Sequence, residues 1–327
     1  MRDGYNPKFL HGTEDSFHIE LPKPSLNIQS DILLPEGAVD GEFEVKYIHY
    51  SLLMSKSNRQ ALVSAANVDN ANQQTVSGSK GRRWFVDARV GRANQIGNAS
   101  YKHSPWDRGH LTRRTAVTWG SFATALKASN DSCAYTNAAM QHENFNEDEW
   151  RVPEELVDDF DLAKDKKLTV MTGPVFTTCD RFFTRNLGDA PVRIPAGFWK
   201  ILSYINKNTG ELSTDAYILF QDIEAIRSSR GRQRVQLGNF AVTTTEVALW
   251  TGLEFDQKLY DSNGMMFAGD DGMGAEILSA SRMKALLPAG QAATLSAGIA
   301  DEEAIQNARE TMSLEDFYSL IEAVSWV

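Results

Sequence analysis

Six apolar segments with the composition of β-strands lie between Val45 and Val242, and they constrain the fold more than any other feature. They contain many β-branched and aromatic residues, which suit a pleated sheet. The Gly173-Pro174 pair is expected to end one of them in a turn. The segments are 45–54, 60–68, 168–176, 197–205, 216–220 and 238–242.

Helices are fewer than strands in this pattern. The segment 121–129 has helical composition. Thr243 and Glu246 have the spacing of a capping box, and Gly252 is well placed to end the helix that they begin. Short strands alternating with a few helices predict an α+β domain over residues 45–260.

The chain has 327 residues and extends beyond this domain at both ends. Residues 1–44 contain scattered prolines and little periodicity, which predicts an irregular N-terminal arm wrapped over the domain. Residues 261–327 begin with a loop rich in glycine and methionine at 262–274. Two helices are expected after it, at about 300–311 and 314–325, so this part is predicted to be a linker and C-terminal helical extension.

The net charge of −10 argues at first against a polyanionic partner. The charge is unevenly distributed, however, because nine basic and only two acidic residues lie between Ser79 and Arg114. The basic residues are Lys80, Arg82, Arg83, Arg89, Arg92, Lys102, Arg108, Arg113 and Arg114. This segment indicates either a phosphate-binding groove or a solvated arginine-rich face.

Several other classes of protein are disfavoured by the sequence. No apolar run approaches the roughly 18 residues of a membrane span. The N-terminal residues lack the basic and apolar regions of a secretory signal, which predicts a cytoplasmic protein unless a specialised system exports it. Cys133 and Cys179 are the only cysteines, too few for a disulfide framework or a four-cysteine zinc site.

Residues that suit phosphodiester hydrolysis begin with the tetrapeptide Asp-Arg-Gly-His at 107–110. Such hydrolysis needs an activated water, neutralisation of the phosphate charge and help for the leaving oxygen. His110 can accept a proton, and the donors of Arg108 match phosphate oxygens. The glycine between them is expected to permit a tight backbone.

Asn146, Trp150 and Glu154 follow at four-residue steps. On one continuous helix this spacing would place an amide, an indole and a carboxylate on the same face, as a metal ligand and a water-holding acid require. Each of these residues alone would more often be structural, and Trp106, Trp119 and Trp150 are expected in the core. The joint spacing therefore carries the hypothesis of a catalytic site.

Together these motifs closely resemble the DNA/RNA non-specific endonuclease family, which includes the Serratia nuclease and endonuclease G and belongs to the ββα-metal superfamily. The resemblance spans about 45–260 and implies a ββα-metal fold with a central, mostly antiparallel sheet flanked by helices. It rests on Asp107–His110, Thr136–Gln141 and Asn146–Glu154, and on Arg82–Asp87, Thr172–Phe176 and Thr251–Phe255.

The resemblance also implies a Mg²⁺-dependent endonuclease that cuts DNA and RNA with little sequence specificity and leaves 5′-phosphate ends. His110 would be the general base, and Asn146 would be the one direct protein ligand of Mg²⁺, with Mn²⁺ as a substitute ion. The remaining implied roles belong to Glu154, which holds a metal-bound water, to Arg82 and Arg108, which contact the scissile phosphate, and to Asn137, which braces the site.

Three departures from the family pattern leave alternatives open. Cys133 stands where the family often has a second asparagine, and Arg83 beside Arg82 leaves the register of the phosphate-binding arginine open. Pro153 interrupts the expected helix before Glu154, so a kink or a fresh helix start is predicted there. The alternative to an active nuclease is a catalytically impaired nucleic-acid-binding or regulatory module of the same fold.

A cytoplasmic nuclease would damage its own cell unless it were held in check. The sequence therefore leads us to expect regulation, by an inhibitor or regulatory protein or within a defence or toxin system. The N-terminal arm or the C-terminal helices would gate the site or mediate assembly. A homodimer is expected from the resemblance.

Overall fold

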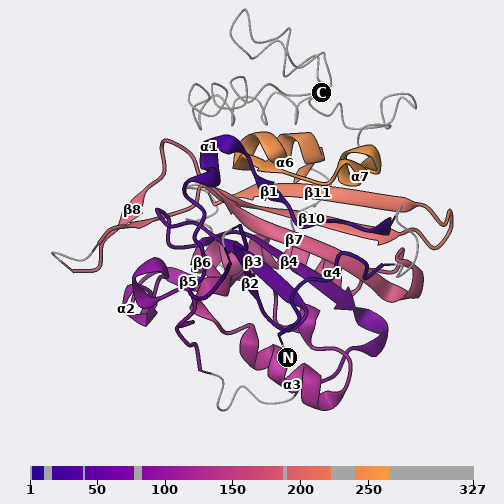
Figure 1. Ribbon diagram of the computed structural model, residues 1–327, viewed down its shortest axis with the longest axis horizontal. Coiled ribbons are helices and arrows are strands. Elements are labelled where there is room, and N and C mark those ends of the chain that lie inside the picture. The colour runs from indigo at the N-terminus through magenta and orange to yellow at the C-terminus, as the bar shows by residue number, and fades with distance from the viewer. Residues whose placement is uncertain are drawn as a thin grey trace, which may run out of the picture.

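The computed structural model describes residues 2–10, 17–39, 41–76, 83–186, 190–221 and 240–264 of the chain. It shows a central antiparallel sheet of seven strands in the order β12-β11-β10-β7-β4-β3-β2 (Figure 1). These strands are β2 (Glu44–Lys46), β3 (Tyr50–Met54), β4 (Ala61–Asp69), β7 (Lys167–Val175), β10 (Gly197–Ile205), β11 (Leu212–Phe220) and β12 (Ala241–Val242). The α+β prediction with an antiparallel sheet is confirmed.

The described part of the chain also contains three two-stranded pairs and six α-helices, besides shorter helical turns. The pairs are β1 (Lys23–Pro24) with β13 (Leu253–Glu254), β5 (Trp106–His110) with β6 (Ala138–His142), and β8 (Phe182–Phe183) with β9 (Val192–Arg193). The helices are α1 (Leu26–Gln29), α2 (Asn98–Tyr101), α3 (Phe122–Asp131), α4 (Arg151–Asp158), α6 (Thr244–Thr251) and α7 (Gln257–Asp261).

Two of the predicted strands differ in detail from the sheet. The segment 45–54 forms two strands, because His49 has a positive φ of 69° and turns the chain between β2 and β3. The expected turn at Gly173-Pro174 is wrong, since β7 continues to Val175. The proline is tolerated because β7 pairs with β4 only as far as Thr172, and beyond it pairs with β10 alone.

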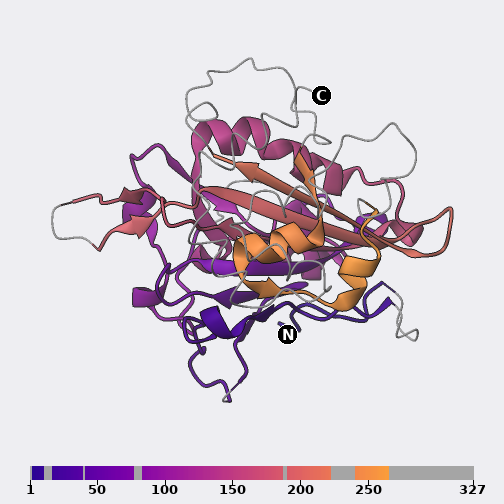
Figure 2. The ribbon, with the colours of Figure 1, turned by 90° about the horizontal axis from the view of Figure 1, so that it is seen from above.

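Both faces of the sheet are covered. On one face α6, α7 and β13 bury a core that includes Trp199, Ile201 and Val247. On the other face α3, β6 and the helical segment 145–158 bury Phe198, Leu202 and Trp150. Figures 1 and 2 show α6 and α7 over one side of the strands, with α3 and the β5–β6 pair on the opposite side.

The helix predicted from Thr243 has the expected caps. The Thr243 side chain accepts from the backbone N–H of Glu246, and the Glu246 carboxylate accepts from the backbone N–H of Thr243. Gly252 ends α6 in the left-handed conformation with φ of 67°, which other residues adopt only at a cost. The helix predicted at 121–129 corresponds to α3, with Ser121 as its N-cap.

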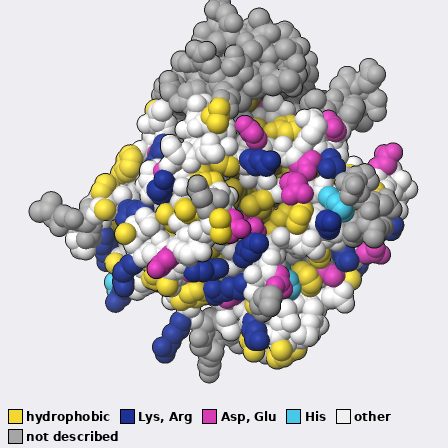
Figure 3. Space-filling view, in the orientation of Figure 1, with side chains coloured by type: hydrophobic (Ala, Val, Ile, Leu, Met, Phe, Trp, Pro, Cys, Tyr) yellow, Lys and Arg dark blue, Asp and Glu magenta, His cyan; other side chains and the backbone are white. Residues whose placement is uncertain are grey.

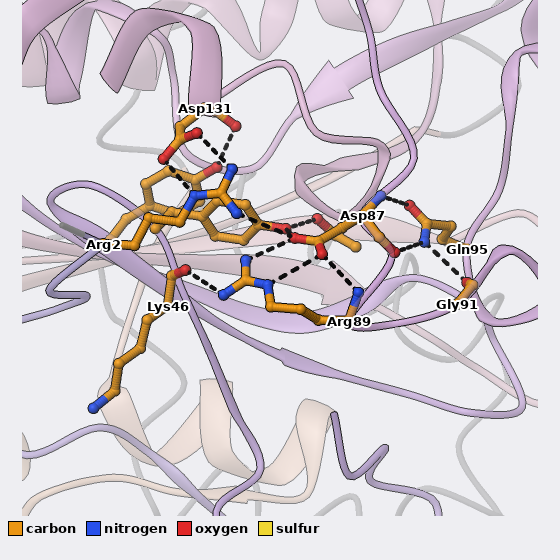
Figure 4. Close-up of polar contacts among 10 residues, drawn as sticks. Arg2, Lys46, Asp87, Arg89, Gly91, Gln95 and Asp131 are labelled. Carbon is orange, nitrogen blue, oxygen red and sulfur yellow. Dashed lines mark hydrogen bonds and ion pairs between the residues drawn. The ribbon is translucent and has the colours of Figure 1, made fainter. Parts of the chain in front are cut away.

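The N-terminal arm is attached to the domain at several points. β1 pairs with β13, and the Arg2 guanidinium makes two hydrogen bonds of 2.9 and 2.8 Å to Asp131 at the end of α3. Arg2 also lies 4.0 Å from the buried carboxylate of Asp87, which binds Arg89 and Tyr47 (Figure 4). The hydrogen bonds that Asp87 accepts from Arg89 and Tyr47 hold its pKa below the usual value despite its burial.

The two helices predicted at 300–311 and 314–325 lie outside the described residues. Nothing in the described part of the chain is a helix that could cross a membrane.

Candidate active site

Two strands and a helical segment form a compact unit against one face of the sheet. β5 contains the Asp-Arg-Gly-His tetrapeptide and pairs with β6 in antiparallel register, so that His110 lies opposite Ala138. The chain then continues through a π-helix, Phe145–Glu149, into α4. This order places every candidate residue between 107 and 154 on one ββα unit.

Arg108 and His110 lie on the same face of β5, because side chains alternate along a strand. Both contact Trp84: its ring centroid is 4.8 Å from that of His110 and 5.8 Å from the Arg108 guanidinium carbon. Arg108 also donates to Oδ1 of Asn98 at 2.5 Å and lies over the ring of Tyr101. The rings of Trp84 and Tyr101 and the amide of Asn98 therefore hold the Arg108 guanidinium beside His110.

Asp107 holds Asn146. Nδ2 of Asn146 donates to Oδ2 of Asp107 at 3.0 Å, across 39 residues of sequence. Because the amide nitrogen is engaged by the carboxylate, the amide oxygen of Asn146 is the atom left to accept a donor or bind a cation. Asp107 therefore contacts the predicted metal ligand directly.

Position 109 requires glycine because the Gln141 side chain lies against it, and not because of the tight backbone that the sequence predicted. A Cβ atom added there would lie 2.0 Å from Oε1 of Gln141, which is fully buried over the glycine. Neither amide atom of Gln141 has a hydrogen-bond partner among the residues that the structure describes. Gln141 also lies opposite Asp107 in the register, so a buried amide without a protein partner adjoins the Asp107–Asn146 pair.

Asn137 fastens the chain immediately after His110. Its Oδ1 accepts from the backbone N–H of Thr112 at 2.9 Å, and its Nδ2 donates to the carbonyl oxygens of Thr112 and Ser132 at 2.9 and 3.0 Å. Its own carbonyl accepts from the N–H of Leu111. This geometry is suited to bracing the position of His110.

Replacing Asn137 with alanine is expected to lower the free energy of unfolding by about 2–3 kcal/mol, because buried backbone groups lose their partners. Urea unfolding followed by circular dichroism measures the change. Asn208→Ala, in the exposed turn between β10 and β11, is the control and should unfold like the wild type. Equal stability of the two variants would contradict the bracing role.

The segment 145–158 is not one continuous α-helix. The backbone N–H of Trp150 donates to the carbonyl of Phe145, five residues back, and a new helix begins at Arg151. The predicted fresh start is thus confirmed, and Pro153 in the first turn of α4 forfeits no intrahelical hydrogen bond. The π turn also means that residues 146, 150 and 154 do not follow one regular helical face, as the four-residue spacing had suggested.

The predictions for the tryptophans hold in two of three cases. Trp150 is fully buried between the rings of Phe145 and Phe198, and Trp106 is also buried. Trp119 is only half-buried and stacks on the ring of His49.

Glu154 lies in a group of partly buried charges. Its carboxylate is 3.7 Å from the Arg113 guanidinium, which also binds Asp158 at 3.0 Å. Burial raises the pKa of Glu154, and the positive charges of Lys200 and Arg113 oppose that rise. Burial likewise lowers the pKa of Lys200 to about 8. Lys200 is not among the residues predicted from the sequence, although its position in an otherwise apolar strand is unusual.

Some basic residues of the segment 79–114 form ion pairs within the protein. Arg89 binds Asp87, and Arg113 binds Glu154 and Asp158. Arg83, Arg92 and Lys102 are exposed, and Figure 3 shows lysine and arginine side chains along the left and lower left of the molecule. Arg82 lies outside the described residues. The exposed members are compatible with either predicted alternative, whereas Arg89 and Arg113 are engaged in ion pairs within the protein.

The donors near Asn146 suit a hard cation that keeps most of its waters. In the described ranges no cluster of three or more histidine, cysteine or acidic side chains could hold a metal. The oriented oxygen of Asn146 and the unpartnered amide of Gln141 are oxygen donors, which Mg²⁺ prefers, and Mg²⁺ commonly uses few protein ligands. The residues present therefore fit the expected ion.

Comparison with known proteins agrees with this geometry. The fold is similar to that of EndoG in a crystal structure of the EndoG/EndoGI complex, with a TM-score of 0.52. The two sequences are 17% identical, and the match covers 65% of this chain and 84% of the other. The curated protein "Uncharacterized protein y4fB" of Sinorhizobium fredii (strain NBRC 101917 / NGR234) is 27% identical over 280 residues. That match covers 80% of this chain but only 40% of the relative's length.

The family model for DNA/RNA non-specific endonucleases matches residues 36–262. The match includes the whole ββα unit and every strand of the central sheet. The chain therefore belongs to the DNA/RNA non-specific endonuclease family.

Proposed function

We propose that this protein is a Mg²⁺-dependent endonuclease that hydrolyses phosphodiester bonds of DNA and RNA with little sequence specificity. The observation that carries the proposal is the unit built on β5: Arg108 and His110 lie together against Trp84, and Asp107 on the same strand orients Asn146. A proton acceptor, a phosphate-binding cation and a metal ligand thus come from one short strand and the helical segment packed near it.

In this proposal His110 accepts the proton of the attacking water, and Arg108 and Arg82 bind the scissile phosphate. Arginine suits the second task because its fork of donors matches two phosphate oxygens. Arg108 has an additional advantage, since the rings of Trp84 and Tyr101 restrict its side chain before substrate arrives. Asn137 keeps the backbone after His110 in place.

Asn146 would bind Mg²⁺ through its amide oxygen, and Mn²⁺ would substitute. The bound ion would stabilise the charge that develops on the phosphate and on the leaving 3′ oxygen. Glu154 would accept a hydrogen bond from a water of the ion, and Gln141 offers a further buried amide next to Asn146. Asp107 contributes by fixing which amide atom of Asn146 is available.

Little sequence specificity is expected because arginine and lysine contacts to phosphate carry no base information. The same contacts release counterions from the nucleic acid, so activity should fall steeply with added salt. The exposed members of the basic segment are the residues proposed to make these contacts.

Regulation and assembly form part of the proposal. EndoG, which has a similar fold, was crystallised in a complex with EndoGI that describes the mechanism of EndoG inhibition. That complex supports the proposal that an inhibitor binds this chain too. We also propose a homodimer, a cytoplasmic location or specialised export, and a place in a defence or toxin system. The division into an arm, a catalytic domain over 45–260 and a C-terminal extension belongs to the same proposal.

The test is incubation of the purified protein with plasmid DNA and with RNA, with Mg²⁺, with Mn²⁺ or with EDTA. Both substrates should be cut with either ion, and EDTA should abolish cutting until excess Mg²⁺ is restored. Binding of both nucleic acids without cleavage under any divalent ion would instead support the impaired module. Cleavage that persists in EDTA would contradict metal dependence.

A further inference from the structure

The β8–β9 pair is attached to the candidate site by packing. Phe183 on β8 and Val192 on β9 lie opposite each other, and both pack in the aromatic cluster that includes Trp84 and Tyr101. These two rings are the ones that contact the Arg108 guanidinium. Figure 1 shows β8 and α2 on the same side of the molecule as β5. The β8–β9 pair thus belongs to the layer that holds Arg108.

Two arginines flank β8, and each contacts the part of the chain that leads into β5. The Arg181 guanidinium carbon lies 5.5 Å from the ring centroid of Trp106, the first residue of β5. Nη1 of Arg185 donates to the carbonyl oxygen of His103 at 2.8 Å. The exposed Lys102 immediately precedes His103. Three cationic residues, Arg181, Arg185 and Lys102, therefore lie around the loop that enters β5.

The charges of these three residues are not neutralised within the described parts of the chain, where none of them forms an ion pair with another described residue. Arg193 on β9 differs, because Asp180 binds it at 2.8 Å. Arg181 and Arg185 donate to backbone carbonyl oxygens, which carry no full charge. Arg181 is also exposed, so its positive charge is accessible to a ligand.

An acidic residue, Glu143, also lies at this loop. Its backbone N–H donates to the carbonyl oxygen of Pro105 at 3.1 Å, and its side chain is exposed. Three positive charges against this negative one leave the loop basic, in contrast with the net charge of −10 of the whole chain. A basic surface beside the candidate site of an acidic protein indicates a polyanion as its partner.

Strand geometry gives the direction from the candidate site to these cations. Trp106, Arg108 and His110 lie on the same face of β5, because side chains alternate along a strand. At about 3.4 Å per residue, Trp106 lies roughly 7 Å from Arg108 and about 14 Å from His110 along the strand. A rise of about 7 Å corresponds to two nucleotides of one duplex strand. Arg108 and the Arg181 that lies over Trp106 are therefore spaced to bind phosphates of the same polynucleotide.

We propose that a nucleic-acid strand bound at the site continues along β5 towards β8, where Arg181 and Arg185 bind phosphates beyond the scissile one. This inference rests on the proposed function, because it extends the substrate from the site proposed there. The two arginines come from a different part of the chain than the basic segment 79–114. The substrate class is thus a polynucleotide of several nucleotides, DNA or RNA, read through its backbone and not through its bases.

The experiment measures binding of a fluorescent single-stranded DNA of about 20 nucleotides by anisotropy, in EDTA and at several salt concentrations. The variants are Arg181→Gln, Arg185→Gln, the double variant and Arg181→Lys. Lys207→Gln is the matched control, because it removes the same charge just beyond β10, where Lys207 forms an exposed ion pair with Asp161. Circular dichroism checks that each variant is folded.

Each glutamine variant should lose one phosphate contact, which lowers the slope of log Kd against log salt by about 0.7 for a single strand. At about 0.1 M salt this change is roughly fivefold in affinity, and the double variant should lose about 25-fold. Arg181→Lys should keep the wild-type slope, because lysine retains the charge. Glu143→Gln should bind more tightly than the wild type, and Lys207→Gln should match it.

Two outcomes would overturn the inference. The wild-type slope and affinity in both Arg181→Gln and Arg185→Gln would show that the two arginines bind no phosphate. An equal loss in Lys207→Gln would show a general effect of net charge and no local surface. If the wild type cut nothing with Mg²⁺ while the variants lost affinity as expected, the proposed function would fail and the nucleic-acid surface would stand.

Discussion

Replacing His110 with alanine is expected to lower kcat for plasmid cleavage by about 10²- to 10⁴-fold, the usual contribution of a positioned general base. The ring of His110 packs against Trp84 beside Arg108, so its removal deletes the proposed proton acceptor and leaves the proposed phosphate-binding arginine in place. KM should therefore change much less than kcat. Initial rates at several plasmid concentrations, at saturating Mg²⁺, separate the two constants.

His142→Gln is the control for this measurement. His142 lies on the paired strand β6, and its ring packs edge-on against Trp106, at the opposite end of the two strands from His110. Losing this histidine should leave the rate close to that of the wild type. Equal rates for His110→Ala and the wild type would show that another group accepts the proton.

Gly109→Ala is expected to lower both stability and activity, although it adds one methyl group. That methyl would lie 2.0 Å from Oε1 and 2.2 Å from Cδ of Gln141, far inside contact distance. Overpacking of this kind costs about 1–3 kcal/mol, and relief requires Gln141 to leave its place beside Asp107. Urea unfolding and the rate of plasmid cleavage, measured on the same preparations, test both effects.

The variant Gln141→Ala separates the two causes. Combined with Gly109→Ala it removes the atoms that clash, so the double variant should unfold nearly like the wild type. Its activity should stay low, because it lacks the Gln141 amide, which has no hydrogen-bond partner among the described residues and is proposed to lie next to the metal ligand Asn146. Full activity of Gln141→Ala would mean that this amide has no such role. Gly97→Ala, where an added methyl meets nothing within 4 Å, is the control for a glycine change in itself.

Much of the fold was predictable because it depends on local patterns. The long strands β4, β7 and β10 coincide with apolar runs, and α6 begins and ends at the caps read from Thr243, Glu246 and Gly252. The short strands, such as β1 and β8, were not predicted. Two residues carry no periodicity, and such strands exist only because a distant segment supplies their hydrogen bonds.

The candidate site was predictable in part for a related reason. His110, Arg108, Asn137 and Asn146 occur in recognisable motifs, and the structure brings them onto the β5–β6 pair and the helical segment after it. Gln141 occurs in the same motifs, but its fully buried amide becomes visible only once the strands are paired. Their chemical roles remain predictions for the experiments above.

The long strands, the helix caps, the family motifs and the order of the catalytic candidates could be predicted from the sequence, because each depends on residues that are close together along the chain. The reason that position 109 is glycine, and the identity of the Asn146 atom that remains available, became clear from the three-dimensional contacts alone. These features depend on contacts between segments that are tens of residues apart. A contact of that kind is fixed by strand register and burial, which no local pattern specifies.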